Sequence, residues 1–466
     1  MSLSYIMEVI LLCIIIIYIV PIILIGIYSS RKIKNEKDFF LANRKLNIFP
    51  LTATITATTV GGSATIVAGG RIYEQGLPAL WYDIAGAIGL IVLGLFLAKK
   101  VRKTKLYTLP DITGYLYDEK VRLASAILIL ITEITWISLL IQSSSLLLSV
   151  VLPFEYEIIL ITISILFIAY TLIGGQLAVV YTDIIQFFVM IIGICFIATP
   201  LLLSEALPKL SQIPLDTISF PINSNIGILT AGSIFFMMFL PHIVGPDIYS
   251  KILCAKDELS ARKGVLFSGF FKFIFAISIG IISISAIVLY PNIENSYVAI
   301  PTVVFGLPTL LAGIILSAFI STMISSSDSC LISAGTILSI DILHTKNILI
   351  SRIGIFIVGF FALLLSLFVT NIESVLGVSG ILKTLQIAYT IFTAGLTMPV
   401  IFGFYKEKTK VTSRGALWSL ILGGFTSIIW LNFAPYGEYG VLIGLAFSIP
   451  PLILFRKKTK KDNNFI

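Results

Sequence analysis

The stretch TATTVGGSATIVAGG, residues 56–70, interrupts a long apolar run with two adjacent glycines. Gly61 and Gly62 follow a series of β-branched residues and fall near the middle of the run from 47 to 70. A helix in lipid has to satisfy its own backbone hydrogen bonds, so a break at that depth is tolerated only where it packs inside protein or lines a cavity. The sequence therefore predicts an interrupted membrane helix, although paired glycines also permit ordinary close packing between helices.

A second apolar run is interrupted in the same manner by FLPHIVGPDIYSK, residues 239–251, which contains Pro241, Gly245 and Pro246. If each interrupted run opens a five-helix bundle, the bundles cover 47–204 and 226–404 and are inserted with opposite topology, because five is odd. Paired breaks at corresponding positions of two inverted halves indicate the binding site of a transporter. Taken singly, either break is also explained by a proline kink or by close packing.

The composition places the whole chain in a membrane. Of 466 residues, 57 % are hydrophobic and only 12 % are charged, and the mean hydropathy is +1.03. Apolar runs of about 20 residues, the length that spans a bilayer, recur from end to end. The first run is too long for the core of a signal peptide and lacks a cleavage site, so we interpret it as a span. Thirteen spans are predicted near 5–28, 47–70, 78–98, 123–152, 157–174, 178–204, 226–249, 264–290, 308–341, 350–370, 380–404, 415–434 and 438–455.

The spans and loops divide the chain into five segments. The two five-helix repeats are preceded by a first span with a basic loop, separated by an extracellular loop, and followed by two further spans with a basic tail. The expected boundaries are 1–46, 47–204, 205–225, 226–404 and 405–466.

The net charge of +8 is explained by topology. Basic residues fall into alternate loops, one of which we expect to hold Lys251, Lys256, Arg262 and Lys263. By the positive-inside rule, the amino terminus lies outside, the carboxyl terminus lies in the cytoplasm, and the chain is a multi-pass protein of the cell membrane. This placement argues against nucleic acid as a partner. The richness in isoleucine and lysine suggests a prokaryotic source, and the four scattered cysteines have no metal-ligand spacing.

Hydroxyl groups gather on one predicted span, within ISTMISSSDSC at residues 320–330. Helical spacing predicts one polar stripe, formed by Ala318, Ser321, Thr322, Ser325, Ser329 and Ser333. Such hydroxyls commonly bond back to carbonyls one turn earlier and do no more than pack. Sodium is a hard ion that takes about five or six oxygens, and a broken helix frees backbone carbonyls to supply them. Ser321 and Thr322 are therefore candidate sodium ligands beside the break at Gly61–Gly62.

Ionisable residues at membrane depth are functional candidates by default. Glu133 lies deep in the fourth predicted span, Asp83 near the outer end of the third, and Asp328 near the inner end of the ninth. Asp183 lies close to the cytoplasmic end of the sixth, where a solvated helix-start carboxylate is the alternative. His242 lies in the second break, where it could donate to a solute or simply pack.

Six motifs together resemble the sodium:solute symporter family, whose members carry sugars, proline, pantothenate, sialic acid and monocarboxylates. They are DFFLANRKL (38–46), YEQG (73–76), TLPD (108–111), GGQLAVVYTDIIQ (174–186), CAKDELSAR (254–262) and SAFISTMISSSDS (317–329). The chain departs from the family pattern at Leu116–Tyr117 and at Ser250–Lys251. The resemblance implies an all-α polytopic membrane protein with a leucine-transporter-type 5+5 inverted repeat, one extra amino-terminal helix and two extra carboxyl-terminal helices.

The resemblance also implies two cation sites. The sodium ligands would be the carbonyls of Ala57, Val60 and Ala318 with the hydroxyls of Ser321 and Thr322. Asp183 and Ser325 stand where some relatives hold a second sodium ion, and the same positions could serve a proton.

The implied substrate positions are less uniform. Ser63–Ala64 replaces the polar pair of sugar carriers, and Thr59 replaces the acidic residue of proline carriers. An amino acid or a monocarboxylate is therefore favoured over a sugar, held partly by backbone groups freed at the break, where the helix dipole suits a carboxylate. The expected substrate-binding residues are Thr59, Gly61, Gly62, Tyr82, Asp83, His242 and Gln386.

These patterns predict a sodium-coupled secondary active symporter that imports a small polar solute by alternating access, with Na⁺ as coupling ion and no organic cofactor. A proton-coupled carrier of the same fold would use Asp183 or Glu133. A transporter-like membrane sensor would need a cytoplasmic domain, and only about ten residues follow the last predicted span. An enzyme is not expected, because the chain lacks a nucleophile–histidine pairing, a metal cluster and a phosphate loop.

Overall fold

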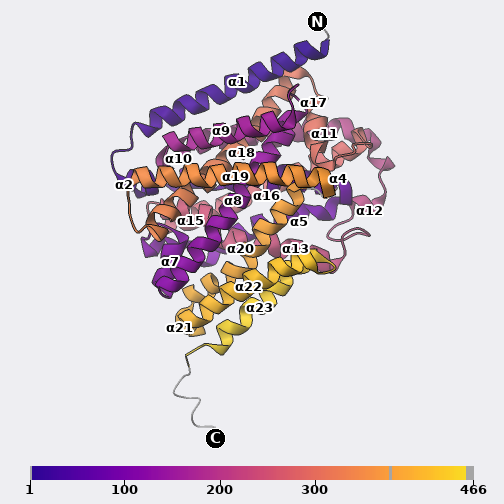
Figure 1. Ribbon diagram of the computed structural model, residues 1–466. Helices are drawn as coiled ribbons and strands as arrows, with labels where there is room; N and C mark the ends of the chain where they lie inside the picture. Colours follow the sequence, from indigo (N-terminus) through magenta and orange to yellow (C-terminus); the bar gives the residue numbers. More distant parts are fainter. Residues whose placement is uncertain (1–2, 377–379, 458–466) are drawn as a thin grey trace.

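The computed structural model describes residues 3–376 and 380–457, and within them the chain forms helices and no β-strand. In this described part of the chain, twelve helices are long and apolar enough to cross a membrane, and the number is thirteen if the bent pair Ile48–Thr59 and Ser63–Gln75 counts as one span. The all-helical membrane fold expected from the sequence is confirmed (Figure 1). The basic tail expected beyond residue 457 lies outside the described residues.

The first half of the chain contains the following helices. They are α1 (Leu3–Ser30), α2 (Glu36–Leu41), α3 (Ile48–Thr59), the π turn η2 (Ser63–Val67), α4 (Ala68–Gln75), α5 (Trp81–Phe96), α6 (Ala98–Thr104), α7 (Leu109–Leu116), α8 (Glu119–Ser149), α9 (Tyr156–Ile173), α10 (Gln176–Met190), the π segment η4 (Ile191–Ala198), α11 (Thr199–Ala206) and α12 (Leu215–Ile218).

The second half continues in the same way. Its helices are α13 (Ile228–Phe239), α14 (Pro241–Val244), α15 (Pro246–Leu253), α16 (Glu258–Leu289), α17 (Ala299–Phe305), α18 (Thr309–Ile337), the π turn η7 (Leu338–Ile342), α19 (Ile348–Leu376), α20 (Gly380–Phe404), α21 (Lys406–Thr409), α22 (Ser413–Phe433) and α23 (Gly440–Leu454). Five short 3₁₀ turns occur in the described part of the chain, at Ala42–Arg44, Leu77–Leu80, Leu207–Gln212, Ser296–Val298 and Gly437–Tyr439. Helix α12 follows the third of them.

Both predicted breaks are present. Helix α3 ends at Thr59 and the chain resumes at Ser63 with a bend of 59° between the two parts. A Cβ atom on Gly61 would lie 2.6 Å from the Ser326 hydroxyl of α18, so only glycine allows this close approach. In the second break, Gly245 is extended, with φ −56° and ψ 129°, between α14 and α15. Pro246 starts α15, where its missing N–H costs nothing.

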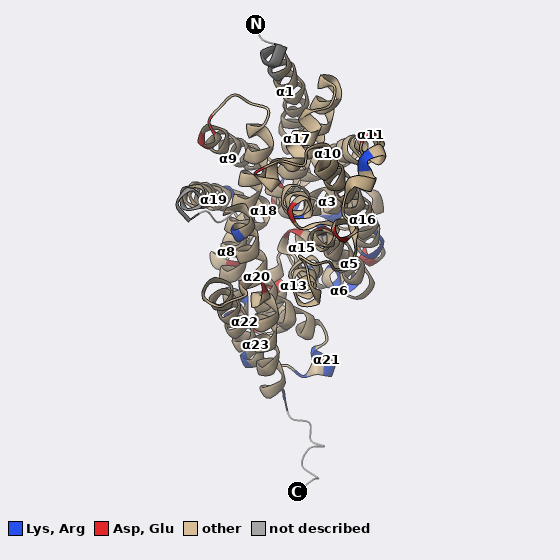
Figure 2. Ribbon diagram, turned by 90° about the vertical axis from the view of Figure 1, so that its right-hand side faces the viewer, with Lys and Arg blue, Asp and Glu red and all other residues tan. Residues whose placement is uncertain are grey.

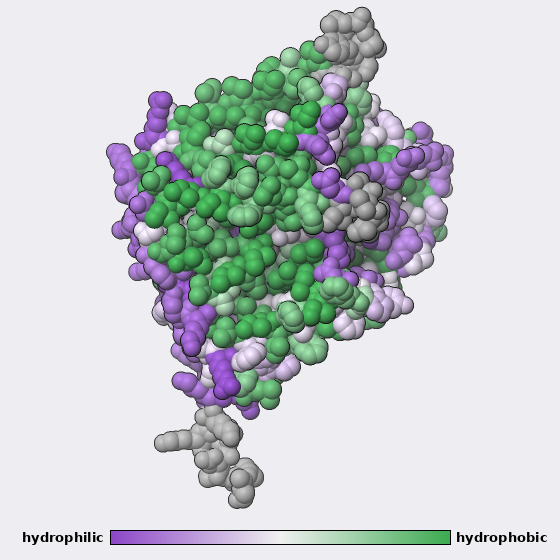
Figure 3. Space-filling view, in the orientation of Figure 1, coloured by the Kyte–Doolittle hydropathy of each residue, from purple (hydrophilic) through white to green (hydrophobic). Residues whose placement is uncertain are grey.

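Burial separates inner from outer helices. In the membrane-spanning part of α18, 78 % of residues are buried, compared with 22 % in α1. The outer surface is apolar, as expected for contact with lipid tails, and a broad hydrophobic face is seen across α1, α9 and α19 (Figure 3). Helices α3, α8, α15, α18 and α20 are thus shielded from lipid, and the two breaks lie among them.

The expectation that Lys251 belongs to a cytoplasmic loop is wrong. Helix α15 continues to Leu253 and α16 begins at Glu258, so the loop between them is shorter than predicted. Lys251 is fully buried inside the span, and so is Lys272 on α16. Charged residues are also seen in the interior beside α3 and α15 (Figure 2). Both lysines need a buried partner, because an isolated ammonium group is costly in the bundle interior.

The predicted orientation can be tested by cysteine labelling. Lys103 and Lys209 are exposed, and three spans separate them, so they lie on opposite sides of the membrane. In a background without native cysteines, K209C should react with a membrane-impermeant maleimide in intact cells. K103C should react only after permeabilisation. The opposite pattern would reverse the predicted topology.

Candidate functional site

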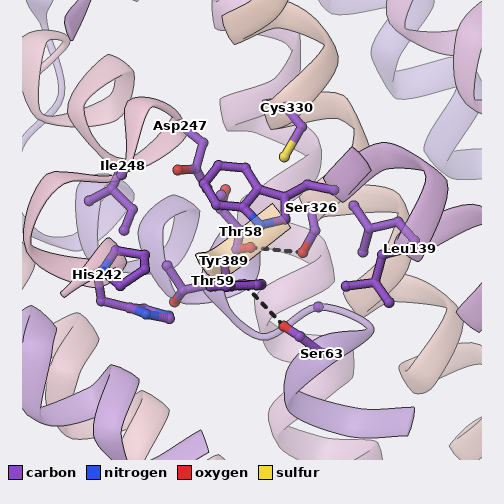
Figure 4. Close-up of a pocket in the computed structure, with 15 residues that line it drawn as sticks. Thr58, Thr59, Ser63, Leu139, His242, Asp247, Ile248, Ser326, Cys330 and Tyr389 are labelled. Carbon is purple, nitrogen blue, oxygen red and sulfur yellow. Dashed lines mark hydrogen bonds between the residues drawn. The ribbon is translucent and has the colours of Figure 1, made fainter. Parts of the chain in front are cut away.

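A cavity lies where the two breaks meet. It has a free volume of about 520 Å³, including its open mouth, and is lined by the break after α3, the α14–α15 break, and helices α8, α18 and α20. Figure 4 shows Asp247 and Ser63 at opposite ends of this space with Tyr389 between them. The cavity is therefore built by both halves of the chain.

Hydrogen-bond donors collect at the end formed by the first break. Among the described residues, the backbone N–H groups of Gly61, Gly62 and Ser63 donate no hydrogen bond to another part of the protein. The Ser63 hydroxyl lies 3.3 Å from the Tyr389 hydroxyl, and either can donate. Unpaired N–H groups at the start of a helical segment are a favourable environment for a carboxylate.

The opposite end is acidic and aromatic. Asp247 belongs to the first turn of α15 and forms no ion pair with a basic side chain among the described residues. The rings of Trp136 and Tyr389 lie 5.3 Å apart between centroids, inclined by 57°. The Nδ1 atom of His242 lies 2.7 Å from the Met238 carbonyl and must donate to it. The lining contains no lysine or arginine, so its field favours a positively charged group.

A buried ion pair supports the first break from behind. Lys272 Nζ lies 2.6 Å from Asp83 Oδ1 and donates to the Thr59 carbonyl at 2.7 Å. The two charged side chains are fully buried. This pair joins α5 and α16 to the last carbonyl of α3. Asp83, expected to bind the solute, instead faces Lys272, and its Oδ2 has no hydrogen-bond partner among the described residues.

A second buried ion pair lies on the far side of α3. Lys251 Nζ is 3.2 Å from Asp183 Oδ2. The Ser325 hydroxyl donates to Asp183 Oδ1 at 2.5 Å, and the Thr54 hydroxyl donates to Oδ2. Helices α3, α10, α15 and α18 thus meet at one carboxylate. Asp183 is not the solvated helix-start residue considered as its alternative, because it is fully buried.

The predicted hydroxyl stripe is divided between two faces of α18. Ser321 donates to the Tyr18 hydroxyl of α1 at 2.6 Å, and Ser325 faces Asp183. Ser326 instead donates to the Thr58 carbonyl at 2.7 Å, and Ser329 lies 2.8 Å from the Thr58 hydroxyl. The stripe is therefore wider than the sequence suggested.

The carbonyl groups needed for sodium are free at the break. Among the described residues, no group donates to the carbonyls of Ala57 or Val60. Thr322 lies four residues before Ser326, so it shares the face of α18 that contacts α3. Its hydroxyl donates to the Phe319 carbonyl at 2.7 Å and keeps lone pairs for a cation. Ala318 and Ser321 are buried on the same helix.

The expected substrate residues separate into two groups. Thr59, Gly61 and His242 line the cavity. The remaining expected residues lie outside its lining, namely Gly62, Tyr82, Asp83 and Gln386. Glu133 is fully buried on α8, and Asp328 accepts a hydrogen bond from Thr171 at 2.8 Å.

Sequence reasoning missed five residues, namely Trp136, Asp247, Lys251, Lys272 and Tyr389. Lys272, which lies inside the predicted span 264–290, was a usable signal, since a lysine at membrane depth requires a buried partner. Asp247 follows Pro246 directly in the second break. The aromatic pair gave no signal, because aromatic residues are frequent throughout the spans.

Residues 39–423 match the sodium:solute symporter family. The chain belongs to this family. It is 25 % identical to the sodium/glucose cotransporter of Vibrio parahaemolyticus, over 90 % of this chain and 84 % of the relative. It is 24 % identical to the sodium/proline symporter of Escherichia coli strain K12, over 94 % and 91 % of the two chains.

Solved structures show the same fold. A substrate-bound, outward-open Na⁺-coupled sialic acid symporter superposes with a TM-score of 0.80 at 18 % identity, over 97 % of this chain and 99 % of the other. The expected leucine-transporter-type architecture is thereby confirmed. Members of this family are sodium-coupled secondary transporters and not enzymes.

The assignment of Thr322 to sodium binding can be tested with sodium alone. Thr322→Ala should raise the sodium concentration that half-saturates thermal stabilisation of the purified protein by about tenfold, equivalent to about 1.4 kcal/mol, because one oxygen ligand is lost. Ser317→Ala is the matched control, since Ser317 is buried on the same helix and only donates to the Gly313 carbonyl at 2.8 Å. Equal sodium dependence in the two variants would contradict the assignment.

Proposed function

We propose that this symporter imports a small zwitterionic solute of the amino-acid type together with sodium. The observation that carries the proposal is the charge distribution of the cavity, with Asp247 at one end and unpaired backbone N–H groups at the other. Of the two solute classes that the sequence favoured, an amino acid matches both ends. A monocarboxylate matches only the N–H end and would be repelled by Asp247.

The ammonium group would bind beside Asp247. Trp136 and Tyr389 offer aromatic faces near that carboxylate, and a cation over such a ring gains about 0.5–2 kcal/mol. Burying a carboxylate without a counter-ion costs free energy, and a positively charged solute bound beside Asp247 would offset that cost. Lys251 and Lys272 do not compete for this role, because each is paired elsewhere.

The carboxylate group would bind at the first break. The N–H groups of Gly61 and Ser63, with the hydroxyls of Ser63 and Tyr389, can hold it without a basic residue. The Escherichia coli relative is named for proline, which is itself a zwitterion. A neutral sugar would leave the buried Asp247 carboxylate without a counter-charge.

Sodium would couple to the solute through the broken helix that they share. Carbonyls of Ala57 and Val60 would face the ion, while N–H groups a few residues on would face the solute. A membrane potential of 100 mV contributes about 2.3 kcal/mol per charge moved. A tenfold sodium gradient adds about 1.4 kcal/mol, so one ion then supports accumulation of roughly five-hundredfold.

The proposal is tested by uptake into proteoliposomes that contain the full chain. A sodium gradient should drive entry of at least one L-amino acid but not of lactate or glucose. Potassium in place of sodium should abolish uptake. Uptake that follows a proton gradient and ignores sodium would support the proton-coupled alternative, with Glu133 as relay, because Asp183 is already paired with Lys251.

Asp247→Asn should weaken binding of the transported amino acid by at least about thirtyfold, roughly 2 kcal/mol, since the buried ammonium loses its counter-charge. Asp247→Glu should retain more affinity because it keeps the charge. Asp216→Asn is the control, as Asp216 is exposed on α12 and lies outside the cavity lining. The dissociation constant is measured by thermal shift at saturating sodium. Unchanged affinity in the Asp247→Asn variant would exclude this residue from ammonium recognition.

A further inference from the structure

We propose that a second cavity, formed by α6, α7, α20 and α21, binds the phosphodiester headgroup of an anionic phospholipid, with Lys100 and Lys406 as its central contacts. This cavity shares no lining residue with the cavity at the two breaks. A lipid bound there is therefore separate from the solute and from sodium, and the proposed function does not depend on it.

The second cavity is large and basic. Its free volume is about 1280 Å³, including its open mouth. Its lining contains Lys100 and Lys103 of α6, Lys406 and Lys408 of α21, and one carboxylate, Glu407. The basic residues of α21 are seen in Figure 2. Among the described residues, none of the four lysines forms an ion pair. The cavity therefore gathers positive charge that the protein leaves without a counter-ion.

Two of these lysines are held in place by their surroundings. Lys100 Nζ lies 3.3 Å from the ring centroid of Tyr405 and donates to the Phe404 carbonyl at 3.3 Å. Lys406 Nζ lies 5.1 Å from the ring centroid of Tyr117 and donates to the last carbonyl of α7. An ammonium group has three donors, so each lysine keeps two N–H groups for an anion. Side chains that are already ordered lose little freedom on binding.

The electrostatics of the cavity favour a bound anion. Burial and the positive charge of Lys408 lower the pKa of Lys100. Burial and the positive charge of Lys457 lower the pKa of Lys406. Each ammonium group is thus disfavoured by its present environment, and a nearby negative charge would stabilise it. A phosphodiester supplies that charge together with oxygen acceptors for the free N–H groups.

The apolar surface beside the cavity favours a lipid over a free phosphate. Leu95 and Phe96, at the end of α5, are 46 % and 58 % exposed, and they precede the lysines of α6 closely in the chain. Tyr115, which lines the cavity, is 73 % exposed and of a residue type that gathers at membrane interfaces. Acyl chains can lie against the apolar end of α5 while the phosphate reaches the lysines. Basic pockets between membrane helices bind anionic headgroups in this manner.

The test measures lipid binding to the purified full chain by native mass spectrometry. Dioleoylphosphatidylglycerol should bind more tightly than dioleoylphosphatidylcholine, which has the same chains and no net charge. Lys100→Gln/Lys406→Gln should weaken binding of the phosphatidylglycerol by about tenfold or more and leave the phosphatidylcholine unaffected, because two cationic contacts are lost. Lys100→Arg/Lys406→Arg keeps both charges and should keep the preference for the anionic lipid.

The matched control is Lys37→Gln/Lys263→Gln, which removes two exposed lysines outside the cavity. It should bind phosphatidylglycerol as the wild type does, and an equal loss in this control would overturn the proposal. Equal affinity of the wild type for the two lipids would also overturn it.

Two further measurements address folding and the source of the phosphate. Lys103→Gln/Lys408→Gln changes only exposed side chains of the lining and should weaken phosphatidylglycerol binding even if the first variant fails to fold. Unchanged binding in this variant, with the first one misfolded, would contradict the site. Glycerol 3-phosphate at the same concentration as the lipid should not displace it. Displacement would show that the cavity takes a free phosphate and would overturn the assignment to a lipid.

Discussion

The structure depends on one constraint: a helix that breaks inside a membrane must have its freed backbone groups satisfied by protein or by ligand. At the break after α3, the Lys272 ammonium group donates a hydrogen bond to the Thr59 carbonyl, and the Ser326 hydroxyl donates one to the Thr58 carbonyl. Among the described residues, the carbonyls of Ala57 and Val60 and the N–H groups of residues 61–63 have no hydrogen-bond partner in the protein. Those groups have opposite polarity, so one break can serve a cation and a carboxylate.

The buried carboxylates differ in whether a lysine neutralises their charge. Asp83 and Asp183 are each neutralised by a lysine, and both pairs hold helices against α3 or its neighbours. Asp247 has no such partner and faces the cavity. Two closed ion pairs therefore surround the cavity, and the carboxylate in its lining is open to a guest. This arrangement explains why a solute with an ammonium group suits the site better than a plain anion.

The spans and both breaks could be predicted because hydropathy, glycine and proline act locally along the chain. The sodium-facing helix was also predictable, since serines and a threonine recur at helical spacing. The ion pairs could not be derived in this way. Lys251 and Asp183 are 68 residues apart, and Lys272 and Asp83 are 189 apart. Nothing local distinguishes Lys251 from the loop lysines that follow it, so its burial emerges only from the packing of α15.

The most direct test of the account is whether sodium and an amino acid stabilise the protein together. Purified full-length protein is heated with each of a panel of amino acids, monocarboxylates and sugars, in sodium or in potassium. The account predicts that an amino acid raises the melting temperature in sodium but not in potassium, because ligands that share the break must tighten each other. Stabilisation by a solute regardless of sodium would contradict it.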